Sequence, residues 1–327
     1  MTPRRETAIV FTAPGVAELQ PVEPDFRPLG PHEMAGRTLC TLVSVGTELA
    51  VLLGKEFPKI VGYAAVFEVE RVGAEVTDIQ PGQRVFCLGP HRSFQRTDRA
   101  SVIPVPENLS PFVALFARMM GVVMSTLTTT TARPPGKVLV TGLGLVGHLA
   151  ARIFQMCGYE VAACDPLESR RELARAAGLK LVLEKPPLDD PEWFERVELV
   201  AECSGHEQAV LDGCNIVSRR GEVVLIGVPW RKQTELSAHD LLWAIFHKYA
   251  VVRSGWEWEI PLHPTPFRPG SLYGNMAAAM RWLAEGRLSV EGLAEVVSPT
   301  ECGRVFQRLA EGTFPLLTAV FDWSHLG

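Results

Sequence analysis

The sequence predicts an α/β protein with two domains, a β-rich domain and a doubly wound parallel sheet. The chain has 327 residues, about twice the usual length of one domain. Short β patterns fill its first third, and strand and helix patterns alternate from about residue 120 onward. Hydrophobic residues make up 47% of the chain and charged residues 21%, as in ordinary globular proteins. We therefore expect a compact fold throughout.

The β patterns of the first third are separated by turn residues. They read AIVF, TLCTLVSV, AAVFEVERVG, QRVFCLG and ASVIPVP. Within residues 41–54, TLVSVGTELAVLLG predicts a strand, a Gly-Thr-acid turn and then a short helix that begins near Glu48. In this interpretation the Thr47 hydroxyl can cap the helix.

The remainder of the chain alternates between strands and helices. The predicted strands read KVLVT, EVAACD, VELVAECSG, GEVVLIG and YAVVRSG. The predicted helices lie at 146–157, near 169–177 and at 207–217. A proline-rich loop at 259–275 precedes a further helix, MAAAMRWLAEG, and the chain ends in a strand that can rejoin the first domain.

Charge and composition exclude several classes of partner. The net charge is -5 and the basic residues are scattered, so we expect no nucleic-acid partner. The longest apolar run, residues 111–124, contains Arg118 and is shorter than the roughly 20 residues that span a membrane. The N-terminus does not resemble a signal peptide. The seven cysteines include no Cys-x-x-Cys pair, which favours buried thiols. These features predict a cytoplasmic protein without a membrane partner.

A glycine-rich turn, KVLVTGLGLVGHLAARIF, predicts a dinucleotide site of the Rossmann type. Gly142 allows the tight turn, Gly144 lets the backbone approach a pyrophosphate, and Gly147 permits close packing of helix on strand. The diphosphate then meets free N–H groups at the start of the helix. Further cofactor contacts are expected at Leu143, Leu145, Val146, Cys203, Gly205, Gly227 and Val228.

Asp165 favours NAD over NADP. It ends the next strand, 23 residues after Gly142, where a carboxylate can accept hydrogen bonds from ribose hydroxyls. A carboxylate there also repels the additional phosphate of NADP. Arg170 or Arg171 could offset that repulsion, or both could be solvated charges at the start of a helix. NADP therefore remains an alternative.

Four motifs in order, VGTEL, VGYAAVFEVERVGAEVTDIQPGQRVF, GLGLVG and AECSG...GEVVLIG, resemble the medium-chain dehydrogenase/reductase superfamily. This superfamily includes zinc alcohol, sorbitol and threonine dehydrogenases, and the resemblance covers nearly the whole chain. It implies a GroES-like catalytic domain at 1–118, a Rossmann domain at 119–286 and a C-terminal return to the catalytic domain at 287–327. It also implies an active site in the cleft between the domains.

The sequence departs from the zinc-binding members at their ligand positions. Those members have a Cys before the Gly-Thr-acid turn and a His-Glu pair after the glycine found here at Gly62. This chain has Val45, Tyr63 and Ala64 instead, and it lacks the cysteine-rich lobe that holds a structural zinc. Valine and alanine offer no donor atom and neutral tyrosine is a poor ligand, so we expect no zinc. The S-x-G-T-E form of the turn is similar to a zinc-free branch with bacteriochlorophyllide-type biosynthetic dehydrogenases.

Without a metal, the substrate oxygen needs hydrogen-bond donors and a proton path. Thr47 matches the hydroxyl that relays protons in the alcohol dehydrogenases, and Tyr63 could project its phenol into the same cleft or simply pack. Glu48 could orient Thr47, bind substrate or form a salt bridge. His91 is the best-placed histidine for acid–base chemistry on a loop, with a surface or structural role as the alternative. A metal pair of Cys87 and His91 would lack further ligands.

The predicted function is therefore zinc-independent, NAD-linked hydride transfer between nicotinamide and an alcohol/carbonyl substrate, in a specialised biosynthetic pathway. One alternative is NADPH-dependent reduction of an enoyl or quinone-type substrate, and another is a dinucleotide-binding sensor or scaffold without activity. A homodimer is expected, because YAVVRSGW lies at the expected edge of the sheet. The following aromatic residues could line a substrate pocket, the core or a subunit interface: Phe94, Trp230, Trp256, Trp258 and Tyr273.

Overall fold

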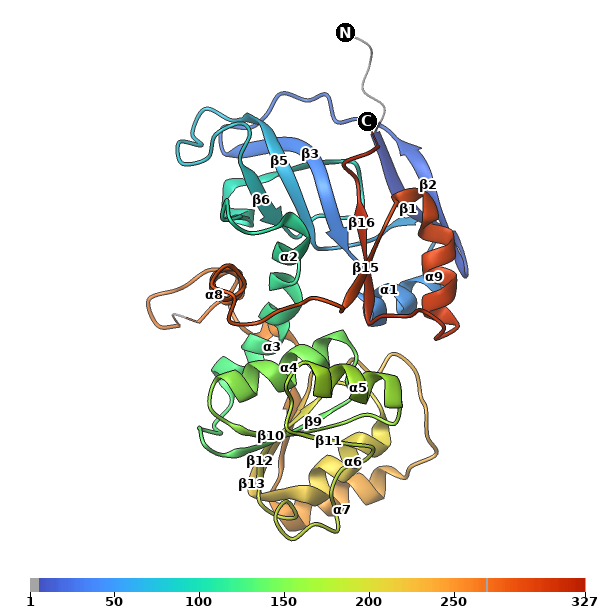
Figure 1. Cartoon of the computed structure of the whole chain (residues 1–327), viewed down its shortest axis with the longest axis vertical. Coiled ribbons are helices and arrows are strands. Elements are labelled where there is room, and N and C mark those ends of the chain that lie inside the picture. The colour runs from blue at the N-terminus through green and yellow to red at the C-terminus, as the bar shows by residue number, and fades with distance from the viewer. Residues whose placement is uncertain (1–5, 269, 327) are drawn as a thin grey trace. The chain divides into compact units, whose positions relative to one another are not determined.

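The computed structural model describes residues 6–268 and 270–326 (Figure 1). The chain forms two compact units, one of Met1–Arg118 with Ala277–Gly327 and the other of Met119–Met276. The second unit ends at Met276, inside helix α8 (Leu272–Ala284). The sequence resemblance predicts this boundary after residue 286. A helix that runs through a boundary leaves no turn or change of composition in the sequence to mark it.

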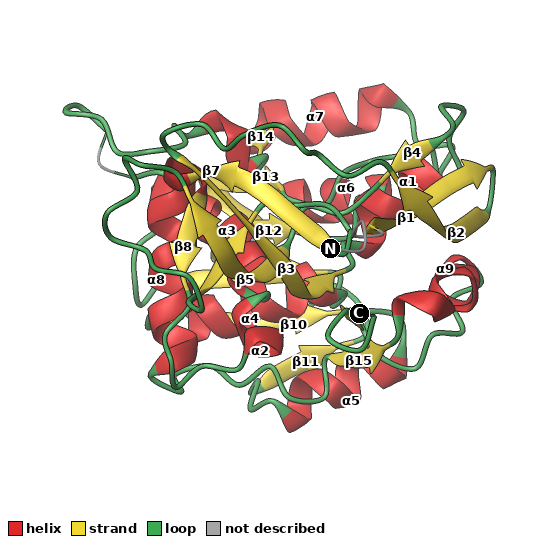
Figure 2. Ribbon diagram, turned by 90° about the horizontal axis from the view of Figure 1, so that it is seen from above, coloured by secondary structure: helices red, strands yellow, loops and turns green. Residues whose placement is uncertain are grey.

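The first unit contains two β-sheets. The smaller has the order β2-β1-β4, which Figure 2 shows side by side, and consists of β1 (Glu6–Ala13), β2 (Val16–Val22) and β4 (Lys59–Ile60). The larger has the order β15-β16-β3-β5-β6-β8, with β7 also paired to β3. Its strands are β15 (Ala294–Val297), β16 (Thr318–Asp322), β3 (Glu33–Leu42), β5 (Ala65–Val72), β6 (Arg84–Cys87), β8 (Val102–Pro104) and β7 (Phe94–Asp98).

The C-terminal segment joins this larger sheet. Strand β16 pairs antiparallel with β3, with Val320 opposite Leu42. Helix α9 (Cys302–Ala310) has a pronounced apolar stripe, in which Val305, Phe306 and Leu309 are buried. It packs on a core shared with β1 and α1 that includes Ile9, Phe11, Leu52, Phe321 and Trp323. Burial of these large side chains ties residues from both ends of the chain into one hydrophobic core.

Helix α1 (Val45–Leu52) begins earlier than the sequence predicts. Its N-cap is Ser44, so Thr47 lies in the first turn and does not cap the helix. Valine and glycine are poor helix formers, so Val45 and Gly46 give no local sign of this earlier start. The Glu48 carboxylate compensates for this, because its Oε1 accepts the Ser44 amide at 2.7 Å and satisfies an N–H group at the helix start.

The second unit is a doubly wound parallel sheet with the order β11-β10-β9-β12-β13-β14. The strands are β9 (Lys137–Thr141), β10 (Glu160–Cys164), β11 (Leu181–Leu183), β12 (Val197–Glu202), β13 (Val217–Leu225) and β14 (Val251–Ser254). Helices α4 (Leu145–Met156) and α5 (Glu168–Ala176) cover one face, and α6 (Glu207–Ile216) and α7 (Ala238–Lys248) the other (Figure 1). The strand order reverses at β9, where such sheets bind ligands. The predicted fold class is confirmed.

The apolar run noted in the sequence forms helices α2 (Pro111–Ala114) and α3 (Ala117–Thr129). By length and composition, the stretch Pro111–Thr129 could cross a membrane, but 72% of its 18-residue window is buried inside the fold. Burial therefore accounts for its composition, as in the core helix of a globular protein.

Candidate active site

The glycine turn between β9 and α4 has the geometry expected of a dinucleotide site. Gly142 has a φ of +80°, which favours glycine, and a Cβ on Gly147 would lie 1.7 Å from the Gly142 carbonyl oxygen. A Cβ on Gly144 would meet no heavy atom within 4 Å. The turn itself therefore requires Gly142 and Gly147. Gly144 faces open space, where a diphosphate can approach the amides at the start of α4.

Asp165 is tied directly to this turn. Its buried carboxylate accepts the Leu143 amide at 2.7 Å and the Leu167 amide at 2.9 Å. Arg170 donates to the same carboxylate at 3.2 Å, whereas Arg171 binds the Asp165 carbonyl oxygen at 2.7 Å. Three of roughly four acceptor positions on the carboxylate are used.

The ends of β12 and β13 lie against the same turn. A Cβ on Gly142 would come within 2.9 Å of Ser204, and one on Gly147 within 3.1 Å of the Cys203 Cβ. A Cβ on Gly227 would lie 2.4 Å from the Gly205 nitrogen. The structure thus brings these predicted cofactor residues together. Burial raises the pKa of the Cys203 thiol, so this side chain stays neutral.

The buried carboxylate of Glu202, which the sequence did not single out, holds this segment in place. It accepts the amides of Ser204 at 2.6 Å and Gly205 at 3.0 Å. Burial raises the pKa of Glu202, and these hydrogen bonds oppose that effect. Its position at the end of β12 was a usable signal, because polar groups at strand ends line the binding edge of such sheets.

A second polar cluster lies in the first unit, around Tyr63. The Tyr63 hydroxyl makes a short hydrogen bond to Ser44 Oγ and lies 3.4 Å from Thr47 Oγ1. The guanidinium carbon of Arg118 is 4.7 Å from the centre of the Tyr63 ring. Burial raises the pKa of Tyr63, so its phenol is protonated at neutral pH and can donate. Tyr63 and Thr47, both predicted from the sequence, therefore meet.

Sequence reasoning missed two members of this cluster, Ser44 and Arg118. The serine is part of the S-x-G-T-E turn and was visible there. The arginine stands inside the apolar run Pro111–Thr129, and an arginine is rarely buried unless its charge interacts with other groups. That mismatch between residue type and surroundings was the available signal.

His91 is buried in a network beside this cluster instead of standing exposed on a loop. Its Nδ1 lies 2.7 Å from Thr41 Oγ1, and its Nε2 lies 2.9 Å from Glu48 Oε2. The Trp323 indole donates to Thr41 Oγ1 at 2.9 Å. A neutral imidazole satisfies every group when Nε2–H donates to the carboxylate and Nδ1 accepts from the threonine. Glu48 and His91 therefore hold the start of α1 and have no direct access to solvent.

The ring of the same histidine leaves no room for a side chain at Gly62. Its φ is +98°, and a Cβ there would lie 2.7 Å from the His91 ring. Only glycine fits this position without moving the ring. The strand that follows Gly62 begins two residues after Tyr63, which places the phenol next to the start of α1.

The donor set at the zinc positions of the relatives does not suit a metal. Val45 packs against the hydrophobic core and Ala64 is buried. Burial raises the pKa of the Cys87 thiol to about 12, which opposes the thiolate form that binds zinc. Across residues 6–268 and 270–326, no group of three or more His, Cys, Asp or Glu side chains is arranged to hold a metal ion.

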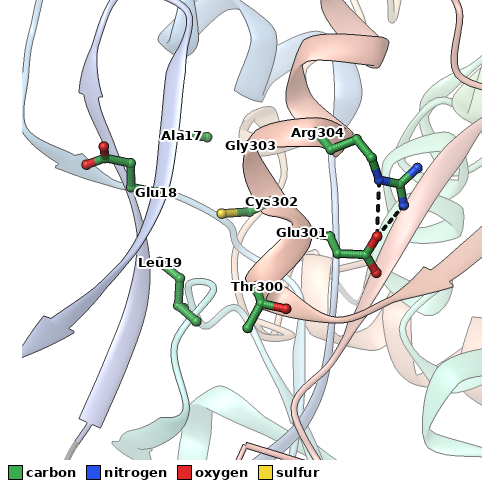
Figure 3. A pocket seen from close by; sticks show the side chains of 8 residues that line it. All are labelled: Ala17, Glu18, Leu19, Thr300, Glu301, Cys302, Gly303 and Arg304. Atoms are coloured by element: carbon green, nitrogen blue, oxygen red, sulfur yellow. Dashed lines mark hydrogen bonds and ion pairs between the residues drawn. The ribbon is translucent and has the colours of Figure 1, made fainter.

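A separate hollow of about 650 Å³ lies between β2 and the start of α9 (Figure 3). Burial raises the pKa of the Cys302 thiol in its wall to about 11, so the thiol is not a nucleophile at neutral pH. Arg304 is bound by Glu301, with its Nε 3.1 Å from Oε2. The walls of this hollow contain none of the residues of the glycine turn or of the Tyr63 cluster.

Comparisons with known proteins agree on one family. A family model described as zinc-binding dehydrogenase matches residues 146–256. An alcohol dehydrogenase of Geobacillus stearothermophilus is 26% identical over 296 residues, which cover 79% of this chain and 81% of that relative. The crystal structure of galactitol-1-phosphate dehydrogenase from Escherichia coli has a TM-score of 0.81 at 17% identity, covering 97% of this chain and 99% of that one. Acetophenone reductase from Geotrichum candidum, solved in complex with NAD, has a TM-score of 0.79 at 18% identity, covering 98% of each chain.

The sequence motifs run through both units, the family model and the alcohol dehydrogenase relative match the sequence, and the solved structures share the fold over nearly the full length. The glycine turn has the geometry that the motif predicts. In motifs, in sequence and in fold, the chain is therefore similar to the medium-chain dehydrogenase/reductase superfamily.

Proposed function

We propose that the protein is a zinc-independent, NAD-linked oxidoreductase that acts on the alcohol/carbonyl pair of a small molecule, in a specialised biosynthetic pathway. Similarity to dehydrogenases over most of the chain supports the oxidoreductase class. The observation that carries the metal-free reaction is the hydrogen-bonded cluster of Tyr63, Ser44 and Thr47, in the segments where zinc-binding relatives have ligands. The seven cysteines are all free thiols, which supports a cytoplasmic location that cell fractionation can test.

Each residue of the cluster has a chemical role in this proposal. The bound dinucleotide supplies or accepts the hydride. In the free protein the Tyr63 phenol hydrogen is donated to Ser44 Oγ. When substrate is bound, Tyr63 donates this hydrogen to the substrate oxygen instead, where negative charge develops as the carbonyl is reduced. The hydroxyls of Ser44 and Thr47 orient the phenol and can return a proton to it from solvent. Glu48 and His91 act indirectly, because they fix the helix that carries Thr47.

Removing either donor is expected to lower turnover. Each hydrogen bond aimed at the developing charge contributes on the order of 3 kcal/mol, or roughly a hundredfold in rate. Tyr63→Phe and Thr47→Val should each reduce turnover of an identified alcohol or carbonyl substrate, with an unchanged dissociation constant for NADH. Leu53→Ala is a suitable control, because Leu53 is exposed just after the same helix.

Elemental analysis of the same preparations completes this test. We expect no stoichiometric zinc. One zinc per chain whose removal by a chelator abolishes activity would overturn the metal-free mechanism. Full turnover in both variants with no metal present would remove Tyr63 and Thr47 from the reaction and assign the proton transfer to another group.

For the cofactor we propose NAD, with Asp165 as the determinant. The Asp165 carboxylate lies beside the glycine turn, and its remaining acceptor position suits a ribose hydroxyl. Arg170 is half-exposed and already paired with this carboxylate, so it is less available to a second phosphate. Titration should show tighter binding of NADH than of NADPH, and Asp165→Ala should reduce that difference. Tighter NADPH binding that Asp165→Ala leaves unchanged would show that the preference is wrong.

We also propose a homodimer formed through β14. This strand is an edge of its sheet, so one row of its backbone donors and acceptors is open to another strand. Apolar side chains are exposed on β14 and on the neighbouring helix α7: Leu242, Trp243, Phe246 and Val251. A second copy that adds its own β14 would satisfy the edge and shield these side chains.

Light scattering at micromolar concentration tests this assembly. The wild type should have the mass of a dimer, and Val251→Lys should shift it toward the monomer, because a charged side chain opposes pairing at an edge. Val296→Lys is a matched control, since Val296 is exposed to a similar extent on the edge strand β15 of the other unit. A monomeric mass for the wild type would remove the proposal.

A further inference from the structure

Arg118 is the most unusual residue near the Tyr63 cluster. It lies in α3 within a strongly apolar stretch and is 3% exposed, and its guanidinium carbon is 4.7 Å from the centre of the Tyr63 ring. At this separation a cation is attracted to the electron-rich face of the ring. A buried charge is retained in a protein where it interacts with other groups. The face of the Tyr63 ring is one group that the Arg118 guanidinium contacts.

We propose that Arg118 is a positioning residue for Tyr63, whose guanidinium holds the phenol ring and supplies positive charge beside it when the phenol gives up its proton. This inference rests on the proposed function, because it assumes that Tyr63 is the proton donor. It adds a source of positive charge at a site where the zinc-binding relatives use a metal ion and this chain has Val45 and Ala64.

The charges around Tyr63 act in opposite directions. Burial and the carboxylate of Glu48 favour the neutral phenol, whereas Arg118 and the hydrogen bonds with Ser44 and Thr47 favour the phenolate. The Glu48 carboxylate accepts hydrogen bonds from His91 and from the Ser44 amide, which stabilise its negative charge in place. Arg118 is therefore the cation that acts on Tyr63 and offsets the effect of burial.

The proton transfer balances without any additional reactant. In the reducing direction, the carbonyl carbon receives hydride from the reduced nicotinamide, the O–H bond of the phenol breaks, and a new O–H bond forms on the substrate oxygen. The product is the alcohol, and the negative charge remains on the phenolate beside Arg118. The hydroxyls of Thr47 and Ser44 then return a proton from solvent, which restores the phenol.

The acidity of Tyr63 can be measured in the full chain without any substrate. Phenolate absorbs in the near ultraviolet, and subtracting the titration of Tyr63→Phe from that of the parent isolates Tyr63 from the other three tyrosines. The subtraction is repeated in Arg118→Met, Arg118→Gln and Arg118→Lys. Arg84→Met serves as the control, because Arg84 is another arginine of the first unit, half-buried and held by the carbonyls of Pro106 and Glu107.

Losing the charge should make Tyr63 at least about tenfold weaker as an acid in the Met and Gln variants. Arg118→Lys should restore most of the acidity, and Arg84→Met should leave it unchanged. Unchanged acidity in a folded neutral variant, judged by circular dichroism, would overturn the inference. If Arg118→Met does not fold, the acidity of Tyr63 in Arg118→Gln is the deciding measurement. Failure of the proposed function has a different signature, since Tyr63→Phe would then retain full turnover whatever the acidity of Tyr63.

Discussion

Replacing Gly144 by alanine should weaken NADH binding at least about tenfold, or 1.4 kcal/mol, with almost no change in the unfolding temperature. In the free protein the new methyl group has space, because no heavy atom lies within 4 Å of its position and Gly144 has an ordinary φ of -62°. That same space is where a diphosphate would approach the backbone. Fluorescence titration with NADH and thermal unfolding measure the two effects separately.

Gly147→Ala is the matched control, and its expected effect is a marked fall in the unfolding temperature. Its Cβ would lie 1.7 Å from the Gly142 carbonyl oxygen, so the turn and helix must move apart. Overpacking of this severity costs about 3 kcal/mol or more of unfolding free energy. If Gly144→Ala binds NADH as tightly as the wild type does, the diphosphate does not contact this turn and the proposed cofactor site is wrong.

The elements with local signals were predictable from the sequence. The glycine turn follows a strand and opens a helix, and both neighbours have clear periodicity, so its place was evident. Strands β2 and β7 were not predicted, because VAELQPV contains a proline and FQRTD is polar. Their pairing with β1 and β3 makes them strands, which is a tertiary effect that no local pattern records.

The candidate site was only partly predictable for the same reason. Thr47 and Tyr63 could be selected by their positions in family motifs. The place of His91 depends on Thr41 and Glu48, 50 and 43 residues away in the sequence. Nothing around the histidine itself distinguishes a buried ring from an exposed one. Arg118 reaches Tyr63 only through the packing of α3.

Replacing Glu48 by leucine should lower the free energy of unfolding by about 2–6 kcal/mol, because it leaves two buried donors unsatisfied at about 1–3 kcal/mol each. Glu48 is 2% exposed, and its carboxylate accepts from His91 Nε2 at 2.9 Å and from the Ser44 amide at 2.7 Å. Leucine would leave both donors buried without an acceptor. Urea denaturation at neutral pH measures the loss.

The control for this prediction is Glu68→Leu. Glu68 pairs with Arg37 at 3.0 Å, but both side chains are substantially exposed, at 36% and 49%. Exposed pairs contribute about 1 kcal/mol or less, so this variant should be nearly as stable as the wild type. The double variant Glu48→Leu/His91→Leu should recover part of the stability lost in Glu48→Leu, because it removes one of the stranded donors together with its acceptor. If Glu48→Leu costs no more than Glu68→Leu, the network of Glu48 and His91 does not hold the start of α1. The hydroxyls of Ser44, the N-cap of α1, and of Thr47, in its first turn, which orient Tyr63, would then need another source of rigidity.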